Sequence, residues 1–140
     1  MLQWDPAARR NRPTRNSLML TKIFDIHPHI ISLDTQRYPV SPLGGKRSAW
    51  SMERPVTFEQ PVAARDEAGV AKAAIVHSST VYGFNNDYVA DVMANHDGRF
   101  TGVFSVDVLA DDAPGKMRYW VSRKLTGLRM YSGGSNITRE

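Results

Sequence analysis

Short apolar runs alternate with amphipathic segments along most of this 140-residue chain. The apolar runs are rich in β-branched and aromatic residues, which favour strands. We predict four strands, at residues 22–27, 71–79, 99–107 and 126–132. Segments between them carry apolar residues at helical spacing. We predict three helices, at residues 57–68, 87–96 and 112–125.

Strands that alternate with helices imply right-handed crossovers and a parallel sheet. The predicted fold class is therefore α/β, either a doubly wound sheet or a (β/α)8 barrel. No glycine-rich phosphate loop follows the first strand, which weakens the nucleotide-binding alternative. Residues 32–56 predict a long loop, in which Tyr38 and Trp50 should pack against the body of the protein. Residues 80–86 predict a turn.

The composition limits which residue types could bind a metal and which class of protein this is. The chain has no cysteine, so a metal would need His, Asp or Glu ligands. Hydrophobic residues make up 41% and charged residues 23% of the chain, which is typical of a soluble globular protein. The sequence shows neither an apolar run long enough for a membrane span nor a secretory signal. We therefore expect a cytoplasmic protein that has no membrane partner.

The basic charge lies mainly at the amino end. Residues 1–20 hold four arginines and one aspartate, a net charge of +3, and the other residues have a net charge of +1. A basic arm can bind nucleic acid electrostatically. The nearly neutral body favours a disordered, solvated arm and no nucleic-acid partner. We place a domain boundary after residue 20, and Met19 is an alternative start of translation.

Two histidines follow the first apolar run, in the segment KIFDIHPHII. Residues i and i+2 of a strand share a face, so His27 and His29 should project the same way. Two converging neutral imidazoles supply half of a metal site, and the alternative is a hydrogen-bonded pair without a metal. Asp25 should lie about 7 Å behind His27, which favours an outer-shell role over that of a third ligand. His77 is the other ligand candidate within reach.

Two residues interrupt the apolar pattern of the helix predicted at 57–68. Pro61 is tolerated in a first turn but costs about 3 kcal/mol in a helix interior. Arg65 lies on the apolar stripe, where its stem would cover the core while the guanidinium reaches water. Both residues indicate that the apolar face of this helix has degenerated.

Six segments together carry a family resemblance. They are FDIHPHI at 24–30, RYP at 37–39, DEAGV at 66–70, VYGFNN at 81–86, GRFTGVFSVD at 98–107 and GLRMYSGGS at 127–135. In this order and spacing, the chain resembles the amidohydrolase superfamily, and specifically its amidohydrolase-related branch. That branch contains lactonases that act on pyrone dicarboxylates, and it also contains decarboxylases.

The resemblance implies a (β/α)8 TIM barrel with a divalent metal, zinc or manganese, at the carboxyl ends of its strands. His27 and His29 match the ligand pair of the first strand. In the family, further histidine ligands come from strands five and six, and an aspartate that serves as general base comes from strand eight. We therefore expect residues 21–140 to form the N-terminal half of the barrel, about four βα units. Such a half has no catalytic residue and could lack the metal.

Four residues are candidate substrate contacts. The resemblance matches Tyr38 and Arg129 to positions that contact a carboxylated substrate in the family lactonases. A guanidinium within a strand is costly unless it is paired, so a structural salt bridge is the alternative for Arg129. Ser79 matches a small hydroxyl residue after the second strand, with Thr80 as the alternative register, and His77 would lie at the barrel mouth. Packing within a loop is the alternative for these residues and for Tyr38.

Three functions are open at this point. The first is a metal-dependent hydrolase that acts on a lactone or amide bond of a small carboxylated substrate, here truncated. The second is a decarboxylase of the same family, in which the metal would orient the substrate. The third is a non-catalytic truncated fragment. Its open strand edges would allow pairing with a second copy of the chain.

Overall fold

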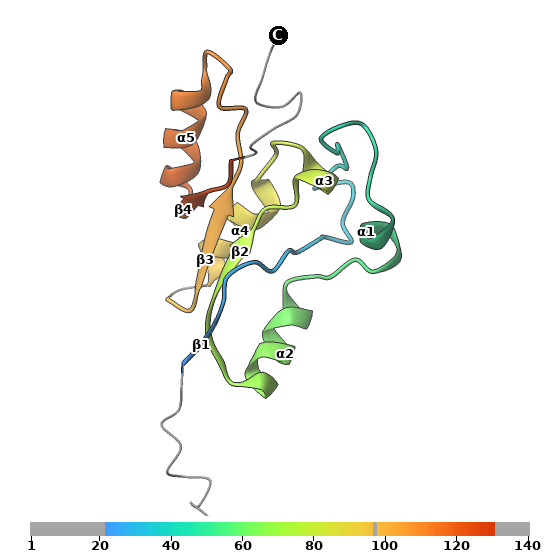
Figure 1. Cartoon of the computed structure of the whole chain (residues 1–140), viewed down its shortest axis with the longest axis vertical. Helices are drawn as coiled ribbons and strands as arrows, with labels where there is room; N and C mark the ends of the chain where they lie inside the picture. The colour runs from blue at the N-terminus through green and yellow to red at the C-terminus, as the bar shows by residue number, and fades with distance from the viewer. Residues whose placement is uncertain (1–21, 97, 131–140) are drawn as a thin grey trace, which may run out of the picture.

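The four predicted strands are present and form one parallel sheet. The computed structural model describes residues 22–96 and 98–130. Its strands are β1 (Ile23–Asp25), β2 (Val70–Val76), β3 (Phe100–Phe104) and β4 (Leu125–Leu128). They pair in the order β1-β2-β3-β4, and every pair is parallel. The predicted α/β class is therefore confirmed, and Figure 1 shows β2 and β3 side by side in the middle of the molecule.

Five helices accompany the sheet in the described part of the chain. They are α1 (Ala49–Glu53), α2 (Glu59–Ala68), α3 (Ser79–Tyr82), α4 (Asp87–Asn95) and α5 (Ala113–Ser122). The three predicted helices correspond to α2, α4 and α5, and α1 lies within the predicted loop. The prediction of a plain turn at 80–86 is wrong at its start. There, the carbonyl of Ser78 accepts hydrogen bonds from the N–H groups of Val81 and Tyr82 and closes a helical turn.

The core lies between one face of the sheet and helices α2, α4 and α5. Alternate strand residues point into it, as strand geometry requires. Its buried members are Ile30, Phe58, Ala73, Ile75, Val89, Ala90, Met93, Phe104, Val106, Trp120 and Leu125. The intervening strand residues, such as Ala74, Thr101 and Val103, are partly exposed on the opposite face. In a closed barrel this opposite face would be the interior.

The loop at 32–56 packs against α3 and α4 through Tyr38, as predicted, whereas the side chain of Trp50 is 45% exposed. Tyr38 is buried in a small cluster with Val81 and Tyr82 of α3. The backbone N–H of Ser41 donates to the carbonyl of Val81 over 2.8 Å. The loop is thereby held at the carboxyl end of β2, from which α3 begins.

Helix α2 accommodates both interruptions of its apolar pattern. It begins at Glu59, so Pro61 lies in the first turn, where the missing N–H costs little. Gly69 ends the helix with a φ of 70°, a left-handed conformation that glycine adopts without strain. Arg65 is only 8% exposed, so the prediction that its guanidinium reaches water is wrong. The reason is a carboxylate partner on β1, described below.

Gly102 of β3 leaves no room for a side chain. A Cβ atom there would collide with Leu125 and would lie 2.8 Å from Cγ of Met93. We expect Gly102→Ala to lower the free energy of unfolding by about 2 kcal/mol, because overpacking forces neighbours out of their rotamers. Gly115→Ala is the control, since Gly115 of α5 is surrounded by open space and alanine should stabilise the helix by up to about 1 kcal/mol. Similar urea denaturation midpoints for the two variants would contradict this account.

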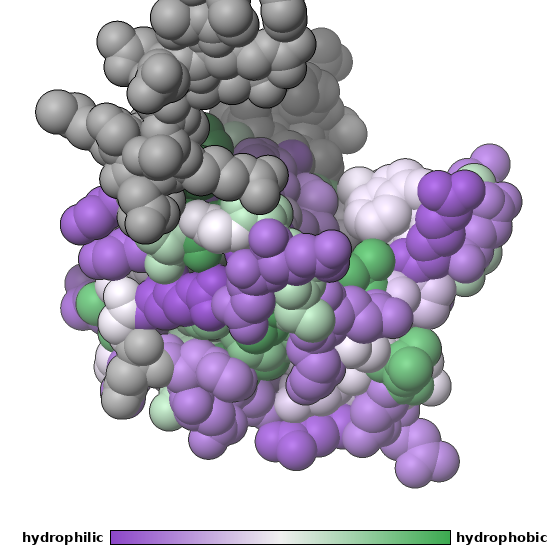
Figure 2. All heavy atoms as spheres, turned by 90° about the horizontal axis from the view of Figure 1, so that it is seen from below, coloured by the Kyte–Doolittle hydropathy of each residue, from purple (hydrophilic) through white to green (hydrophobic). Residues whose placement is uncertain are grey.

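The surface seen from below Figure 1 is mainly hydrophilic. Figure 2 shows it mostly in purple, with scattered apolar spheres. Within residues 22–96 and 98–130, no helix combines the length and the apolar character needed to cross a membrane. The predicted arm at 1–20 and the end of the fourth predicted strand, from residue 131, lie outside the described residues.

Candidate metal and substrate site

His27 and His29 lie beside each other just beyond the carboxyl end of β1. Their ring centroids are 5.0 Å apart and their ring planes are perpendicular. Since β1 ends at Asp25, both histidines belong to the segment that leaves the strand. The two imidazoles are therefore close enough to act on one ligand.

His29 is held in a defined orientation. Its Nδ1–H donates to the carbonyl oxygen of Val76, at the end of β2, over 2.8 Å. The indole ring of Trp50 stacks on the same imidazole, with centroids 6.3 Å apart. Burial lowers the pKa of His29, and the neighbouring charges of Arg129 and His27 lower it further. The imidazole is therefore neutral at pH 7, with Nε2 as its lone-pair nitrogen, which is the form that binds metals.

His77 follows β2 and is 1% exposed. Its Nε2–H donates to the carbonyl oxygen of Gly83 over 2.7 Å. Burial lowers the pKa of His77 to about 4, and the nearby charge of Arg129 acts in the same direction. A neutral, buried imidazole thus ties the end of β2 to the end of α3. Its contact with a substrate stays a prediction.

Arg129 directly follows β4. Its backbone N–H donates to the carbonyl oxygen of Phe104 over 2.7 Å, and the residue is partly buried. Its positive charge lowers the pKa of both His29 and His77, so the guanidinium lies within electrostatic range of both imidazoles. Carboxyl ends of parallel strands meet at one edge of a sheet. The carboxyl ends of β1, β2 and β4 thereby place His27, His29, His77 and Arg129 at one edge of the sheet.

Asp25 is engaged elsewhere. Its Oδ2 accepts hydrogen bonds from Nε and Nη2 of Arg65, over 3.1 and 2.5 Å. Its Oδ1 accepts the backbone N–H of His27 over 3.3 Å. The carboxylate therefore neutralises a buried cation and contacts the histidine segment through the backbone, whereas an outer-shell role would require contact with an imidazole.

Tyr38 contacts helix α4 and Ser79 begins helix α3. The hydroxyl of Tyr38 donates to Oδ2 of Asp91 on α4 over 2.8 Å, and burial raises the pKa of Tyr38 to about 12. Arg37 and Arg123 donate to the same carboxylate, so this network anchors the loop to α4. Ser79 is buried at the first position of α3. Substrate contact by Tyr38 or Ser79 stays a prediction.

A divalent metal fits the histidine pair as half of a site. His29 is neutral, and a backbone carbonyl holds the N–H opposite its lone pair, which is the arrangement of metal-binding histidines. Within the described ranges, no group of three or more His, Cys, Asp or Glu side chains is placed to hold a metal ion. Because a catalytic zinc usually takes three protein ligands, the pair needs at least one more.

Three partners in this region have no distinctive signal in the sequence. Trp50 in a loop predicts packing, but it does not predict stacking on His29. The carbonyl groups of Val76 and Gly83 orient the two buried imidazoles. Every residue carries a carbonyl group, so residue type cannot indicate which carbonyl is used.

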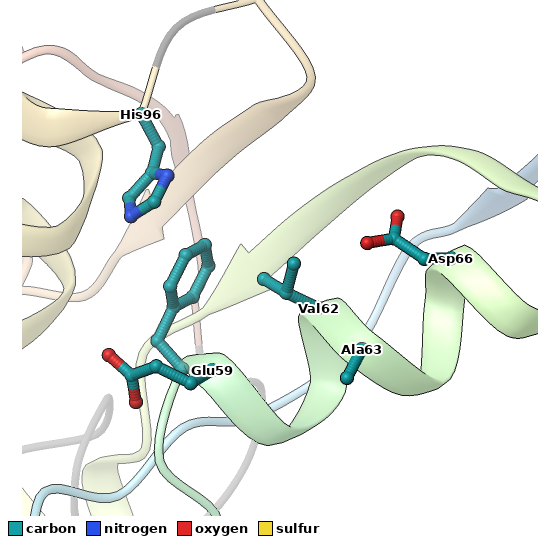
Figure 3. Close-up of a pocket in the computed structure, with 6 residues that line it drawn as sticks. Glu59, Val62, Ala63, Asp66 and His96 are labelled. Atoms are coloured by element: carbon teal, nitrogen blue, oxygen red, sulfur yellow. The ribbon is translucent and has the colours of Figure 1, made fainter.

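A separate pocket lies against helix α2. It has a volume of about 290 Å³ and is lined by Phe58, Glu59, Val62, Ala63, Asp66 and His96. Figure 3 shows Glu59, Val62, Ala63 and Asp66 on the helix and His96 facing them from the end of α4. The group at the strand ends contributes no residue to this lining, so the two features are distinct.

No protein-family model matches this sequence, and a search of curated proteins finds no significant match. Solved structures do match. A probable 2-pyrone-4,6-dicarboxylic acid hydrolase of Acinetobacter baumannii, with citric acid bound, is 18% identical over 78% of this chain and 37% of its own, with a TM-score of 0.57. A Pseudomonas putida protein provisionally given the same hydrolase name is 15% identical over 78% of this chain and 36% of its own, with a TM-score of 0.57. An Agrobacterium tumefaciens protein in its apo form is 14% identical over 76% of this chain and 35% of its own, with a TM-score of 0.55.

The chain has the α/β fold of part of these solved barrel structures. Its parallel sheet and helices match these (β/α)8 structures, and a likeness at such low identity concerns the fold alone. The chain spans 37% of the length of the first of them. The expected barrel-type α/β fold is thus confirmed, over part of a barrel.

Proposed function

We propose that this chain carries two metal ligands and a carboxylate-binding arginine of a metal-dependent hydrolase. Its substrate would be a small carboxylated molecule with a lactone or amide bond. The observation that supports this most is His29, whose neutral imidazole is oriented by Val76 and lies 5.0 Å from His27. The barrel fold is shared with proteins named as pyrone dicarboxylic acid hydrolases, which supports the choice of reaction.

His27 and His29 would hold a divalent ion, zinc or manganese. When bound, such an ion polarises a carbonyl group and lowers the pKa of a water molecule. The protein would keep the lone pair of His29 available, because burial disfavours the imidazolium and the Nδ1–H is committed to a carbonyl. The exposed His27 would complete the pair without a large rearrangement.

Arg129 would bind the carboxylate of the substrate, because a guanidinium can donate two parallel hydrogen bonds to a carboxylate. Arg129 follows β4, so it lies at the same edge of the sheet as the histidines that follow β1 and β2, and its charge lowers the pKa of His29 and His77. Hydrolysis would add water to the carbonyl carbon and break its bond to oxygen or nitrogen. The products are a carboxylic acid and a hydroxyl or amine group. We assign no general base among the described residues.

Calorimetric titration with zinc and manganese tests the metal pair. We expect saturable binding to the wild-type protein and at least tenfold weaker binding to His27→Ala/His29→Ala, because both ligand nitrogens are removed. His96→Gln is the matched control, since this exposed histidine lies at the other pocket and its loss should leave the affinity unchanged. Equal affinities of wild type and double variant, or no binding by wild type, would refute the proposal.

The substrate class is tested on the metal-loaded protein. Lactones with two, one and no carboxylate groups are compared, with product formation as the measurement, in wild type and in Arg129→Gln. Hydrolysis should require a carboxylate on the substrate and should fall in the variant. A hydrolysis rate that is the same for lactones with and without a carboxylate, and the same in wild type and Arg129→Gln, would contradict the role given to Arg129.

A further inference from the structure

We propose that two copies of this chain close one eight-stranded barrel and share a single metal site between their histidine pairs. The inference rests on the proposed function of His27 and His29, and it names a source for the further ligands that a catalytic zinc needs beyond this pair. It starts from the two edges of the sheet.

Both edges of the sheet are open in the part of the chain described here. β1 pairs only with β2, and β4 pairs only with β3, among the described strands. All pairs are parallel, so β4 of one copy can add to β1 of another as a further parallel pair. A twofold axis repeats this contact and closes the sheet, with eight strands in all. A (β/α)8 barrel has this number of strands.

Large apolar side chains lie along both edges. Ile23 and Phe24 of β1 and Ile26 just beyond it are 49%, 54% and 76% exposed, and Leu128 and Met130 at β4 are 37% and 66% exposed. These five side chains expose on the order of 600 Å² per copy, and a stable interface buries roughly 800 Å² per partner. The strand backbones would supply the remaining area together with hydrogen bonds, since an unpaired edge is a template for pairing. A second copy matches both the direction and the apolar character of these edges.

Closure by a twofold axis also completes the ligand set. In an eight-stranded barrel with four strands per copy, the two β1 strands stand opposite each other. The interior of such a barrel is just wide enough for side chains to fill it, so imidazoles from the segments that follow the two β1 strands can meet near the axis. His27 and His29 of both copies then provide four imidazoles, and three protein ligands suffice for a catalytic zinc. The described residues of one copy supply two of these imidazoles, those of His27 and His29.

Light scattering after size exclusion, combined with zinc titration, tests the shared site on the 140-residue chain. We expect a particle of twice 15.7 kDa and saturation at one zinc per two chains. Met130→Lys should give a monomer and weaken zinc binding at least tenfold, because a charge is placed in the apolar edge. Met52→Lys is the matched control, since Met52 of α1 is similarly exposed, at 57%, and should change neither result. Circular dichroism verifies that each variant folds.

The possible outcomes separate this inference from the proposed function. A monomer that binds one zinc per chain through His27 and His29 would overturn the shared site and leave the metal pair intact. A dimer that binds no zinc would overturn both, and so would a monomer that binds none. Equal effects of Met130→Lys and Met52→Lys would overturn the assignment of the β4 edge to the dimer contact.

Discussion

Replacement of Asp25 with alanine is expected to lower the free energy of unfolding by about 2–3 kcal/mol. The side chain of Arg65 is only 10% exposed, and its guanidinium donates twice to Oδ2 of Asp25. Loss of the carboxylate leaves a buried cation without its partner, which is costly because water cannot replace the lost interaction. Partial exposure of the Asp25 side chain, at 38%, keeps the cost below that of a fully buried pair.

Replacement of the other partner, Arg65, should lower the free energy of unfolding less. Arg65→Met removes the buried charge and keeps an apolar stem, while water can solvate the remaining carboxylate of Asp25, so we expect a loss below about 1 kcal/mol. Lys116→Ala, which breaks the exposed pair between Lys116 of α5 and Asp112 just before this helix, is the control and should change stability by less than about 0.5 kcal/mol. Urea denaturation of the three variants measures the differences. Equal losses for Asp25→Ala and Arg65→Met would show that burial of the guanidinium does not determine the cost.

Acidification should destabilise the protein through His77. The folded protein holds this imidazole at a pKa of about 4 because of burial, whereas the unfolded chain has an ordinary value near 6.5. Between these two values the unfolded state binds more protons than the folded state, so stability falls as the pH drops. The contribution of His77 is fully present above pH 6.5 and is lost by about pH 4, a change of about 3 kcal/mol.

His77→Gln isolates this contribution. The glutamine amide can still donate to the carbonyl of Gly83, which now accepts from Nε2 of His77, and it does not titrate. Denaturation curves at several pH values between 7 and 4 should show that the free energy of unfolding depends less steeply on pH in the variant than in the wild type. Some slope should remain in His77→Gln, because burial also lowers the pKa of His29. Parallel profiles for wild type and His77→Gln would mean that His77 is protonated equally easily in both states.

The local pattern of the chain was sufficient to predict the α/β fold class and the order of its main elements. Apolar periodicity depends on near neighbours, so it identified the four strands and the helices α2, α4 and α5. It missed α1 and α3, because four or five residues are too few to show a period. The alternation of strand side chains does not explain the proximity of His27 and His29, because β1 ends at Asp25 and both residues follow it; their rings nevertheless lie 5.0 Å apart.

The electrostatic partners of the candidate site depended on tertiary structure. The sequence by itself determined which residues could ligate a metal, bind a carboxylate or interrupt a helix, because those capacities belong to side-chain chemistry. Only the folded chain decided that Arg65 is neutralised by Asp25, 40 residues away, and that His29 is oriented by Val76, 47 residues away. Contacts between such distant residues arise from the way strands and helices pack. No local pattern encodes that packing, because a partner's position in space depends on the whole chain.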